Sequence, residues 1–210
     1  MKVPKIRQRA VQQRAEETKE AILQAGIELF STQGFEGISI RALEEASNTK
    51  RGLVAYHFES KEELWKNVVD RVFDKLPGAS PEMIAALRGL DKESQIRAHL
   101  TSFIQYSAKY PELSRIIIQE GKTRSWRLGY LVEKYVRPRV SFFSDILGGE
   151  LDAHMLYMFI GAATMVFDVE AECESLYGFN PRSEEFVLEH AKRVCDLFVP
   201  NLPLRTDSAD

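Results

Sequence analysis

Cysteine is nearly absent from the chain: the 210 residues include only two, Cys173 and Cys195, and no Cys-x-x-Cys pair. This scarcity excludes a disulfide framework and a cysteine-based zinc or redox motif, and it favours a reducing cytoplasm. No apolar run is long enough to cross a bilayer comfortably, since the most apolar stretch, residues 155–169, contains Asp168. The basic N-terminus is not followed by the apolar segment of a signal peptide. We therefore expect a cytoplasmic protein without a membrane partner.

Motifs for catalysis and for cofactors are also missing. The sequence has no nucleophile–base pairing and no phosphate-binding motif, and His99, His154 and His190 lack the mutual spacing of metal ligands. We expect no cofactor, no metal site and no enzymatic activity. A helical enzyme or carrier stays open as a remote alternative, which a cleft with two carboxylates of perturbed pKa would favour.

Two segments lack charge of one sign, although the formal net charge of the whole chain is only −3. Residues 1–14 carry Lys and Arg but no acid, whereas residues 152–174 carry Asp and Glu but no Lys or Arg. This asymmetry indicates that the N-terminal part meets a polyanion and the C-terminal part does not. A basic arm over residues 1–16 fits a DNA minor groove and a mobile solvated tail about equally well.

Apolar residues at the helical spacing are abundant. Between Ile22 and Phe30 they recur at i, i+3, i+4, i+7 and i+8, and no segment shows the alternation of a strand. We expect an all-α protein of about nine helices, with a kink at Pro138. The expected division is a basic arm at 1–16, a domain of short helices at 17–76, a domain of long helices at 81–200 and a flexible tail at 201–210. The long helices are expected near 92–109, 112–123, 125–147, 152–177 and 183–198.

Three short helices in the domain at 17–76 fit a helix-turn-helix. Gly34 ends the first helix in the left-handed conformation, and Phe35 folds back as its apolar partner. Ser39 is a good N-cap for the second helix, residues 40–46, and Asn48 tolerates the left-handed turn after it. The third helix is expected from about Thr49 to Phe58.

One face of that third helix suits the major groove of DNA. If Val54 and Phe58 are its buried pair, the opposite face holds Thr49, Gly52, Leu53 and Tyr56. Gly52 lets the backbone approach phosphate, and Leu53 can meet a thymine methyl group. Lys50 and Arg51 lie beside this face, and Arg41 and Lys61 flank it with positive charge. Solvated charges on a small helical bundle are the alternative explanation.

The segments Gly34-Phe35, Ser39-Ile40-Arg41-Ala42-Leu43 and Gly52-Leu53-Val54-Ala55-Tyr56-His57-Phe58-Glu59-Ser60-Lys61-Glu62-Glu63-Leu64 resemble the N-terminal domain of the TetR family of bacterial regulators. The resemblance covers about residues 17–70. Three positions depart from the family pattern: Ala55 replaces a common tyrosine, Asn48 a common glycine and Glu44 a common small residue. Tyr56 is the expected substitute for the phosphate contact of the missing tyrosine.

The resemblance implies an all-helical homodimer whose C-terminal domain binds a ligand and dimerises. It also implies which positions contact DNA, among them Ala55 and His57. Together with the spacing argument, the expected DNA-contacting residues are Ser39, Arg41, Thr49, Lys50, Arg51, Gly52, Leu53, Ala55, Tyr56, His57 and Lys61.

Two apolar stripes on the last two long helices are candidates for the dimer interface, and Gly161 would allow close approach. The expected interface residues are Met155, Phe159, Ala162, Val166, Phe186, Val194 and Leu197. The alternative is that both stripes face the core of their own domain.

The middle helices combine many aromatic residues with isolated polar groups, as the wall of a ligand pocket does. The expected lining residues are Phe103, Tyr106, Glu120, Arg124, Trp126, Tyr130 and Phe159. An aromatic core without a cavity is the alternative.

The sequence therefore predicts a DNA-binding transcriptional regulator, a repressor released from a near-palindromic duplex operator by a small apolar or amphipathic effector. A DNA-binding regulator or structural module without such a ligand is the alternative.

Overall fold

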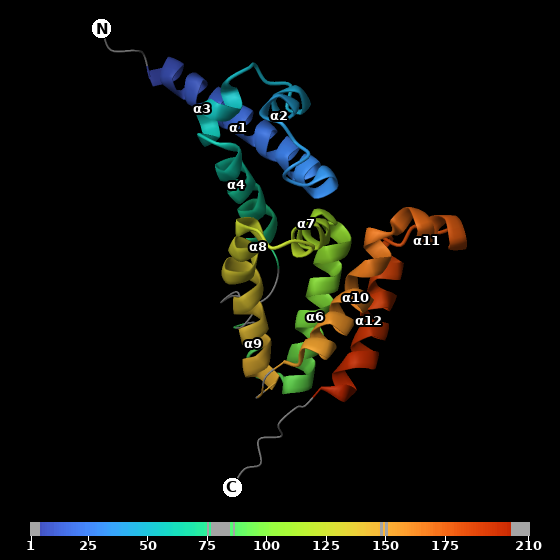
Figure 1. Ribbon diagram of the computed structural model, residues 1–210. Helices are drawn as coiled ribbons and strands as arrows, with labels where there is room; N and C mark the ends of the chain where they lie inside the picture. Colours follow the sequence, from blue (N-terminus) through green and yellow to red (C-terminus); the bar gives the residue numbers. More distant parts are fainter. Residues whose placement is uncertain are drawn as a thin grey trace.

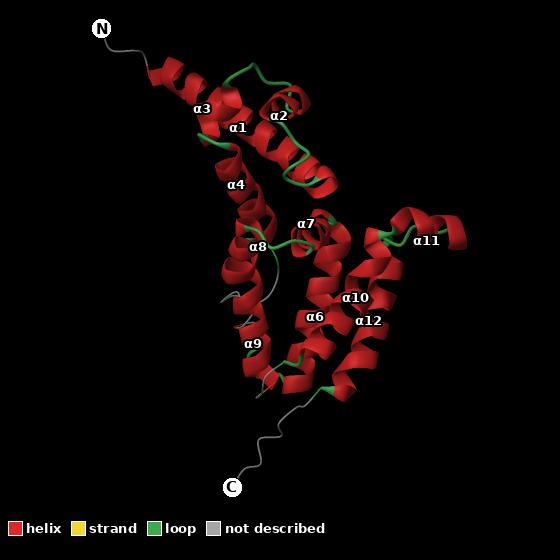
Figure 2. Cartoon of the chain, viewed as in Figure 1, coloured by secondary structure: helices red, strands yellow, loops and turns green. Residues whose placement is uncertain are grey.

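The structure is a computed structural model that describes residues 5–74, 76, 85, 87–147, 149 and 151–202. All regular structure in these residues is helical, which confirms the all-α prediction (Figure 2). None of the helices in the described ranges combines the length and apolar character needed to cross a bilayer. The helices are α1 (Lys5–Gln33), α2 (Ile40–Ala46), α3 (Leu53–Phe58), α4 (Lys61–Phe73), α6 (Lys92–Lys109), α7 (Glu112–Gly121), α8 (Trp126–Leu131), the π-helical segment η1 (Val132–Val136), α9 (Arg137–Leu147), α10 (Ala153–Asp168), α11 (Glu170–Tyr177), α12 (Glu184–Phe198) and the short 3-10 turn η2 (Val199–Asn201).

Local signals define the ends of the N-terminal helices, and those at Gly34, Ser39 and Asn48 do so as expected. The hydroxyl oxygen of Ser39 accepts the N–H of Ala42 at the start of α2, and the Ser60 hydroxyl oxygen accepts the N–H of Glu63 at the start of α4. Gly34 and Asn48 adopt positive φ angles of 72° and 51° in the two turns. Short polar caps and left-handed turn residues therefore fix this part of the fold.

Two expectations for the N-terminal part are wrong. The chain is helical from Lys5 onward, so most of the expected arm at 1–16 is the first turns of α1; residues 1–4 lie outside the described residues. The third helix begins at Leu53 rather than near Thr49, because Gly52 has a φ of 90°, which no helix interior allows.

Helices α1 and α4 pack closely at Gly26. A Cβ atom at this position would lie 2.7 Å from Cγ2 of Val68, so only glycine allows this approach. Trp65 and Phe30 are among the fully buried side chains of the same core. This packing makes α4 an integral part of the domain at 17–76.

The expected kink at Pro138 takes the form of η1 between α8 and α9. Proline has no N–H, and the residue before it, Arg137, donates its N–H to the carbonyl of Val132, five residues back. The wider turn keeps α8 and α9 as one helical column, which starts near the end of α4 and runs away from it (Figure 1).

The helix expected at 152–177 is two helices, separated at Val169, which has non-helical dihedrals. Arg182 fixes this corner. Its guanidinium pairs with Glu170 at 2.6 Å and donates to the carbonyl oxygens of Phe167 and Ala108. Because polar contacts of Arg182 hold this corner, the spacing of apolar residues alone does not predict the break at Val169.

The C-terminal part packs α6, α10 and α12 side by side, while α9 stands across from them (Figure 1). Residues 77–80, between the two expected domains, lie outside the described residues, as do residues 203–210 of the expected tail. The start of that tail is ordered: η2 extends to Asn201, and Leu202 packs against the apolar cluster around Leu147.

Candidate nucleic-acid interface and ligand cavity

The recognition helix α3 is anchored by the two residues that the sequence predicts. Val54 and Phe58 are fully buried, whereas Ala55 and Tyr56 face outward and Tyr56 is 77% exposed. Leu53 and His57 are half-buried at the edges of the same face. The outward face is therefore available to a groove, although the DNA contacts themselves stay predictions.

Glu44 holds the turn between α2 and α3 from inside. In the sequence this residue stands out only because a small residue is common at its position in the TetR pattern. Its side chain is buried, and its Oε1 accepts the N–H of Gly52 at 2.6 Å. Its backbone carbonyl oxygen accepts the N–H of Thr49 at 2.9 Å. One residue of α2 thus fixes both ends of the turn.

Basic side chains surround this face in different ways. Lys50 and Arg51 are exposed in the turn, and Arg41 is exposed in an i,i+4 pair with Glu45. Lys61 instead lies over the Phe35 ring, with its Nζ 4.1 Å from the ring centroid, and burial lowers the pKa of its ammonium group. Ser39 is exposed, but its hydroxyl oxygen is used as the cap of α2.

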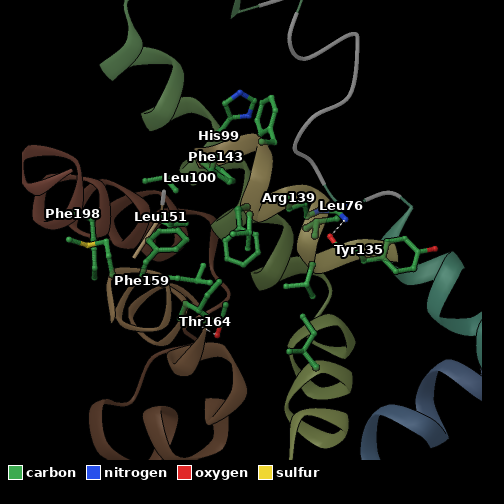
Figure 3. A pocket seen from close by; sticks show the side chains of 18 of the residues that line it. Leu76, His99, Leu100, Tyr135, Arg139, Phe143, Leu151, Phe159, Thr164 and Phe198 are labelled. Atoms are coloured by element: carbon green, nitrogen blue, oxygen red, sulfur yellow. Dashed lines mark hydrogen bonds between the residues drawn. The ribbon is translucent and has the colours of Figure 1, made fainter. Parts of the chain in front are cut away.

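An apolar cavity of about 180 Å³ lies in the C-terminal part, among α6, α7, α9, α10 and the end of α4 (Figure 3). Phe73 and Leu76 reach it from the N-terminal side, and Phe142, Phe143, Leu151 and Phe159 contribute much of the remaining wall. The sequence predicts an apolar pocket among the middle helices, and this cavity is apolar and lies among those helices.

Only two of the expected pocket residues, Phe103 and Phe159, line this cavity. The other five, Tyr106, Glu120, Arg124, Trp126 and Tyr130, do not. Arg124 is exposed, and the remaining four lie where the C-terminal helices meet the domain at 17–76. These four residues were expected to line a pocket. They form a contact between the two domains instead.

That inter-domain contact is built largely on α4. The hydroxyl of Tyr106 donates to the carbonyl of Val72 at 2.7 Å, and the hydroxyl of Tyr130 donates to Asp70 at 2.6 Å. The Trp126 ring contacts the Trp65 ring edge-on, with 5.3 Å between the centroids. These contacts join α6 and α8 to α4.

A buried ion pair completes the inter-domain contact. Nε of Arg127 lies 2.8 Å from Oε2 of Glu120, and both side chains are almost fully buried. Nη1 of Arg127 lies 3.0 Å from Glu36 in the loop after α1, and its guanidinium stands 4.5 Å from the centroid of the Phe35 ring. Arg127 therefore links α7 and α8 to the helix-turn-helix domain.

The polar groups that do line the cavity were not predicted. His99, Ser114, Arg139 and Thr164 lie in its wall. Burial lowers the pKa of His99, which keeps its imidazole neutral, and its Nδ1 has no hydrogen-bond partner in the described part of the chain. The hydroxyl of Ser114 donates to Asp168, whose pKa is raised by burial.

The family model described as bacterial regulatory proteins, tetR family, matches residues 22–68, which span the C-terminal part of α1, all of α2 and α3, and part of α4. The helix-turn-helix domain of the chain belongs to the TetR family. Its match with the HTH-type transcriptional repressor NicS of Pseudomonas putida is 27% identical over 109 residues, 52% of this chain and 50% of NicS. The match with the HTH-type transcriptional regulator RutR of Escherichia coli is 22% identical over 192 residues, 84% of this chain and 87% of RutR.

Solved structures support the same fold outside the helix-turn-helix domain. HlyIIR, a hemolysin II transcriptional regulator, superposes with a TM-score of 0.65 at 18% identity, covering 88% of this chain and 98% of that one. A TetR-like regulator from Rhodococcus sp. RHA1 gives 0.63 at 18% identity, covering 90% and 97%. In sequence, the chain spans 50% of NicS and 63% of the regulator YttP of Bacillus subtilis.

The expected dimer residues of this chain face mostly inward. Met155 and Phe159 line the cavity, Val194 is buried, and Ala162, Val166 and Phe186 pack against the core of α6, α10 and α12. Leu197 alone among the expected residues is largely exposed. Six of the seven positions thus contact the core of their own domain, and five of these six are only half-buried, so their contacts with a second copy stay a prediction.

A different apolar face of α10 is open. Tyr157, Met158 and Met165 are 75%, 56% and 57% exposed, and a Cβ atom at Gly161 would meet nothing within 4 Å. Leu188 on the neighbouring α12 is also exposed. We call this surface the open face; it consists of Tyr157, Met158, Gly161, Met165 and Leu188.

Proposed function

We propose that this chain is a dimeric, DNA-binding transcriptional repressor, released from a near-palindromic operator when a small ligand occupies the cavity. The relatives that it matches are transcriptional regulators, and NicS is a repressor. The observation that carries the proposal is the path of α4, which begins at the recognition unit and ends with Phe73 in the cavity wall.

The DNA-binding step relies on the exposed face of α2, the turn and α3. Lys50 and Arg51 would contact phosphate, and Tyr56 projects far enough from α3 to reach a phosphate or a base edge. Gly52 is exposed and carries no side chain that would hold the backbone away from DNA. Phosphate contacts position the protein, and base contacts supply the sequence preference.

The release step relies on the contact between the cavity and α4. A ligand that packs against Phe73 or moves α9 changes the end of the helix whose start supports α3. Such a ligand needs to favour one of two arrangements by only about 1–3 kcal/mol to act as an effector. The cavity favours this account over a regulator without a ligand.

The dimer would use the open face of α10. Its apolar residues are unpartnered within the protomer, and two copies related by a two-fold axis would bury them against each other. Two recognition helices spaced by about 34–36 Å then fit successive major grooves on one side of the duplex.

The test begins with selection of bound sequences from random duplex DNA. A near-palindromic site should emerge, and its affinity should fall steeply with salt because phosphate contacts release counterions. Arg41→Ala should weaken binding to operator and non-operator DNA alike. Arg193→Ala is the matched control, since Arg193 is also exposed in an i,i+4 pair, on α12 far along the chain. An affinity independent of salt, or equal effects of the two variants, would contradict the proposal.

A further inference from the structure

Arg139 places a cation in the wall of an otherwise apolar cavity (Figure 3). Among the described residues that line the cavity, it is the only Lys or Arg, and none of them is Asp or Glu. His99, the other ionisable nitrogen base there, is kept neutral by burial, which lowers its pKa. As far as the described residues form it, the cavity wall therefore carries one positive charge and no negative charge.

The guanidinium of Arg139 is bonded only to neutral groups. Its Nη1 donates to the carbonyl of Tyr135 at 2.9 Å and its Nη2 to the carbonyl of Phe73 at 3.1 Å. Its Nε is buried without a hydrogen-bond partner, and no carboxylate of the described residues forms an ion pair with it. The Arg139 side chain is half-buried, and the charge of Asp74 acts on it without an ion pair. The hydrogen bond that its buried Nε leaves unmade is unfavourable.

We propose that the effector is a small apolar carboxylic acid, whose carboxylate binds Arg139 and whose apolar body fills the cavity. The inference rests on the proposed function, because it names the ligand class of the same cavity. A carboxylate supplies what the wall lacks, a negative charge and acceptors for the free N–H, in the geometry that a guanidinium fits best.

The size and lining of the cavity limit the rest of the ligand. A protein cavity of about 150 Å³ lined by Leu, Ile and Phe holds a benzene molecule. This cavity of about 180 Å³, lined by residues such as Leu113, Phe142 and Phe159, suits one aromatic ring or a medium-length alkyl chain beside the carboxylate. An amine of the same shape would bring a second positive charge beside Arg139.

The same guanidinium connects the ligand to the DNA-binding domain. Phe73, whose carbonyl accepts from Arg139, is the last residue of α4. A carboxylate competes with this carbonyl for the guanidinium, so binding of the acid loosens the end of α4 from α9. Occupancy of the cavity and the orientation of the recognition helix are thereby coupled.

The test uses the full-length protein and a series of monocarboxylates from benzoate and phenylacetate to decanoate, measured by isothermal titration calorimetry. Each acid is paired with its neutral amide and with the amine of the same carbon skeleton. At least one acid should bind about tenfold or more tightly than its amide, and the amine should bind least. Equal binding of acid and amide, or no binding by any acid of the series, would overturn the proposal.

Two variants assign the effect to Arg139. Arg139→Met keeps the apolar stem and should abolish the preference for acid over amide, while the amide affinity stays close to that of the wild type. Arg193→Met is the control and should keep the preference. If Arg139→Met does not fold, Arg139→Lys should retain a reduced preference, because the charge remains while the fork of donors is lost. Retention of the full preference in either Arg139 variant would contradict the assignment.

Operator affinity without ligand separates this inference from the proposed function. If the protein binds its operator tightly but shows no preference for acids, the proposed function stands and only the proposed ligand class is wrong. If the protein binds acids through Arg139 but recognises no DNA, the proposed function is wrong and the carboxylate site at Arg139 stands.

Discussion

The carboxylate of Glu44 accepts the backbone N–H of Gly52 at 2.6 Å, across the turn that joins the two helices of the recognition unit. Glu44 is buried, and Gly52 has a φ of 90°, so a side chain on one helix bonds the left-handed residue that precedes the other. The contact fixes where α3 begins and at what angle it leaves the turn.

Replacing Glu44 should therefore weaken both the fold of this unit and its DNA affinity. In Glu44→Ala the N–H of Gly52 loses its carboxylate acceptor, and we expect the free energy of unfolding to fall by about 1.5–3 kcal/mol, the contribution of a hydrogen bond to a charged group. Glu44→Gln keeps an acceptor without the charge and should lose less. Urea unfolding and operator binding of the two variants test this. Equal stability of Glu44→Ala and wild type would show that the turn does not depend on the bond.

Gly52→Glu should abolish operator binding by placing a carboxylate on the face that meets phosphate. A Cβ atom at Gly52 would meet nothing within 4 Å, but the positive φ strains any other residue by about 1–2 kcal/mol. Gly52 lies outside the helix, so the substitution brings no gain in helix propensity. Gly52→Gln carries the same strain without the charge. If both variants lose the same affinity, strain and not charge explains the loss.

The N-terminal part of the fold was predictable because its signals are local. Ser39, Gly34 and Asn48 each define a helix end through their own side chain or φ angle, and the buried pair Val54 and Phe58 follows from helical spacing. The start of α3 was missed because Gly52 reads equally well as a helical residue and as a left-handed one.

The contacts of the C-terminal part were less predictable because they join distant residues. Arg127 and Glu36 are 91 positions apart, and nothing in the sequence near either one identifies its partner. The helix α10 is apolar nearly all round, so periodicity cannot distinguish the side that lines the cavity, with Met155 and Phe159, from the open side, with Tyr157 and Met158. Arg139 lies in a charged, polar-looking segment that gives no sign of a cavity.

Arg127→Met should be among the most destabilising single substitutions in the chain. It leaves Glu120 as a buried carboxylate without its counterion, and breaking a buried pair in this way costs about 3–5 kcal/mol. The double variant Arg127→Met, Glu120→Leu removes both charges and should recover most of the loss. Urea unfolding of the wild type, the single variant and the double variant tests this. A double variant no more stable than the single one would mean that the packing of Arg127 on Phe35 matters more than the pair.

Asp70 should make the inter-domain contact sensitive to acid. Burial alone would raise the pKa of Asp70, but hydrogen bonds from Lys134, Tyr130 and Tyr135 outweigh it and hold this pKa below the ordinary value. A depressed pKa contributes stability above the unfolded value of about 3.9, and this contribution is lost as the pH falls through the folded pKa.

The expected result is a difference in melting temperature between the wild type and Asp70→Asn that is full near pH 6 and shrinks as the pH falls below about 4. Glu133→Gln is the control. The pKa of Glu133 is lowered by its pair with Arg137 on the helix surface, which touches no other domain, so this variant should change the melting temperature little. A difference for Asp70→Asn that is constant from pH 6 to pH 3 would show that the Asp70 contacts do not depend on its charge.

We predict that two subunits meet through the open face of α10 and not through the apolar stripe of α10 that contacts the domain core. Gly161→Trp adds a large side chain where a Cβ atom meets nothing, so the protomer should keep its helical circular-dichroism spectrum. If two copies meet at this face, the indole ring holds them apart, and light scattering at micromolar concentration should give the mass of one chain. Operator affinity should then fall by about 10²–10⁴-fold, because each recognition helix binds its half-site alone.

Two further variants complete the test. Gly129→Trp is the matched control, since Gly129 also has open space at its Cβ but lies on α8, away from the open face, and it should remain a dimer. Phe159→Lys places a charge in the cavity wall and should yield unfolded or insoluble protein rather than a folded monomer. A wild-type mass of one chain, or a dimeric Gly161→Trp, would show that the subunits do not meet through the open face.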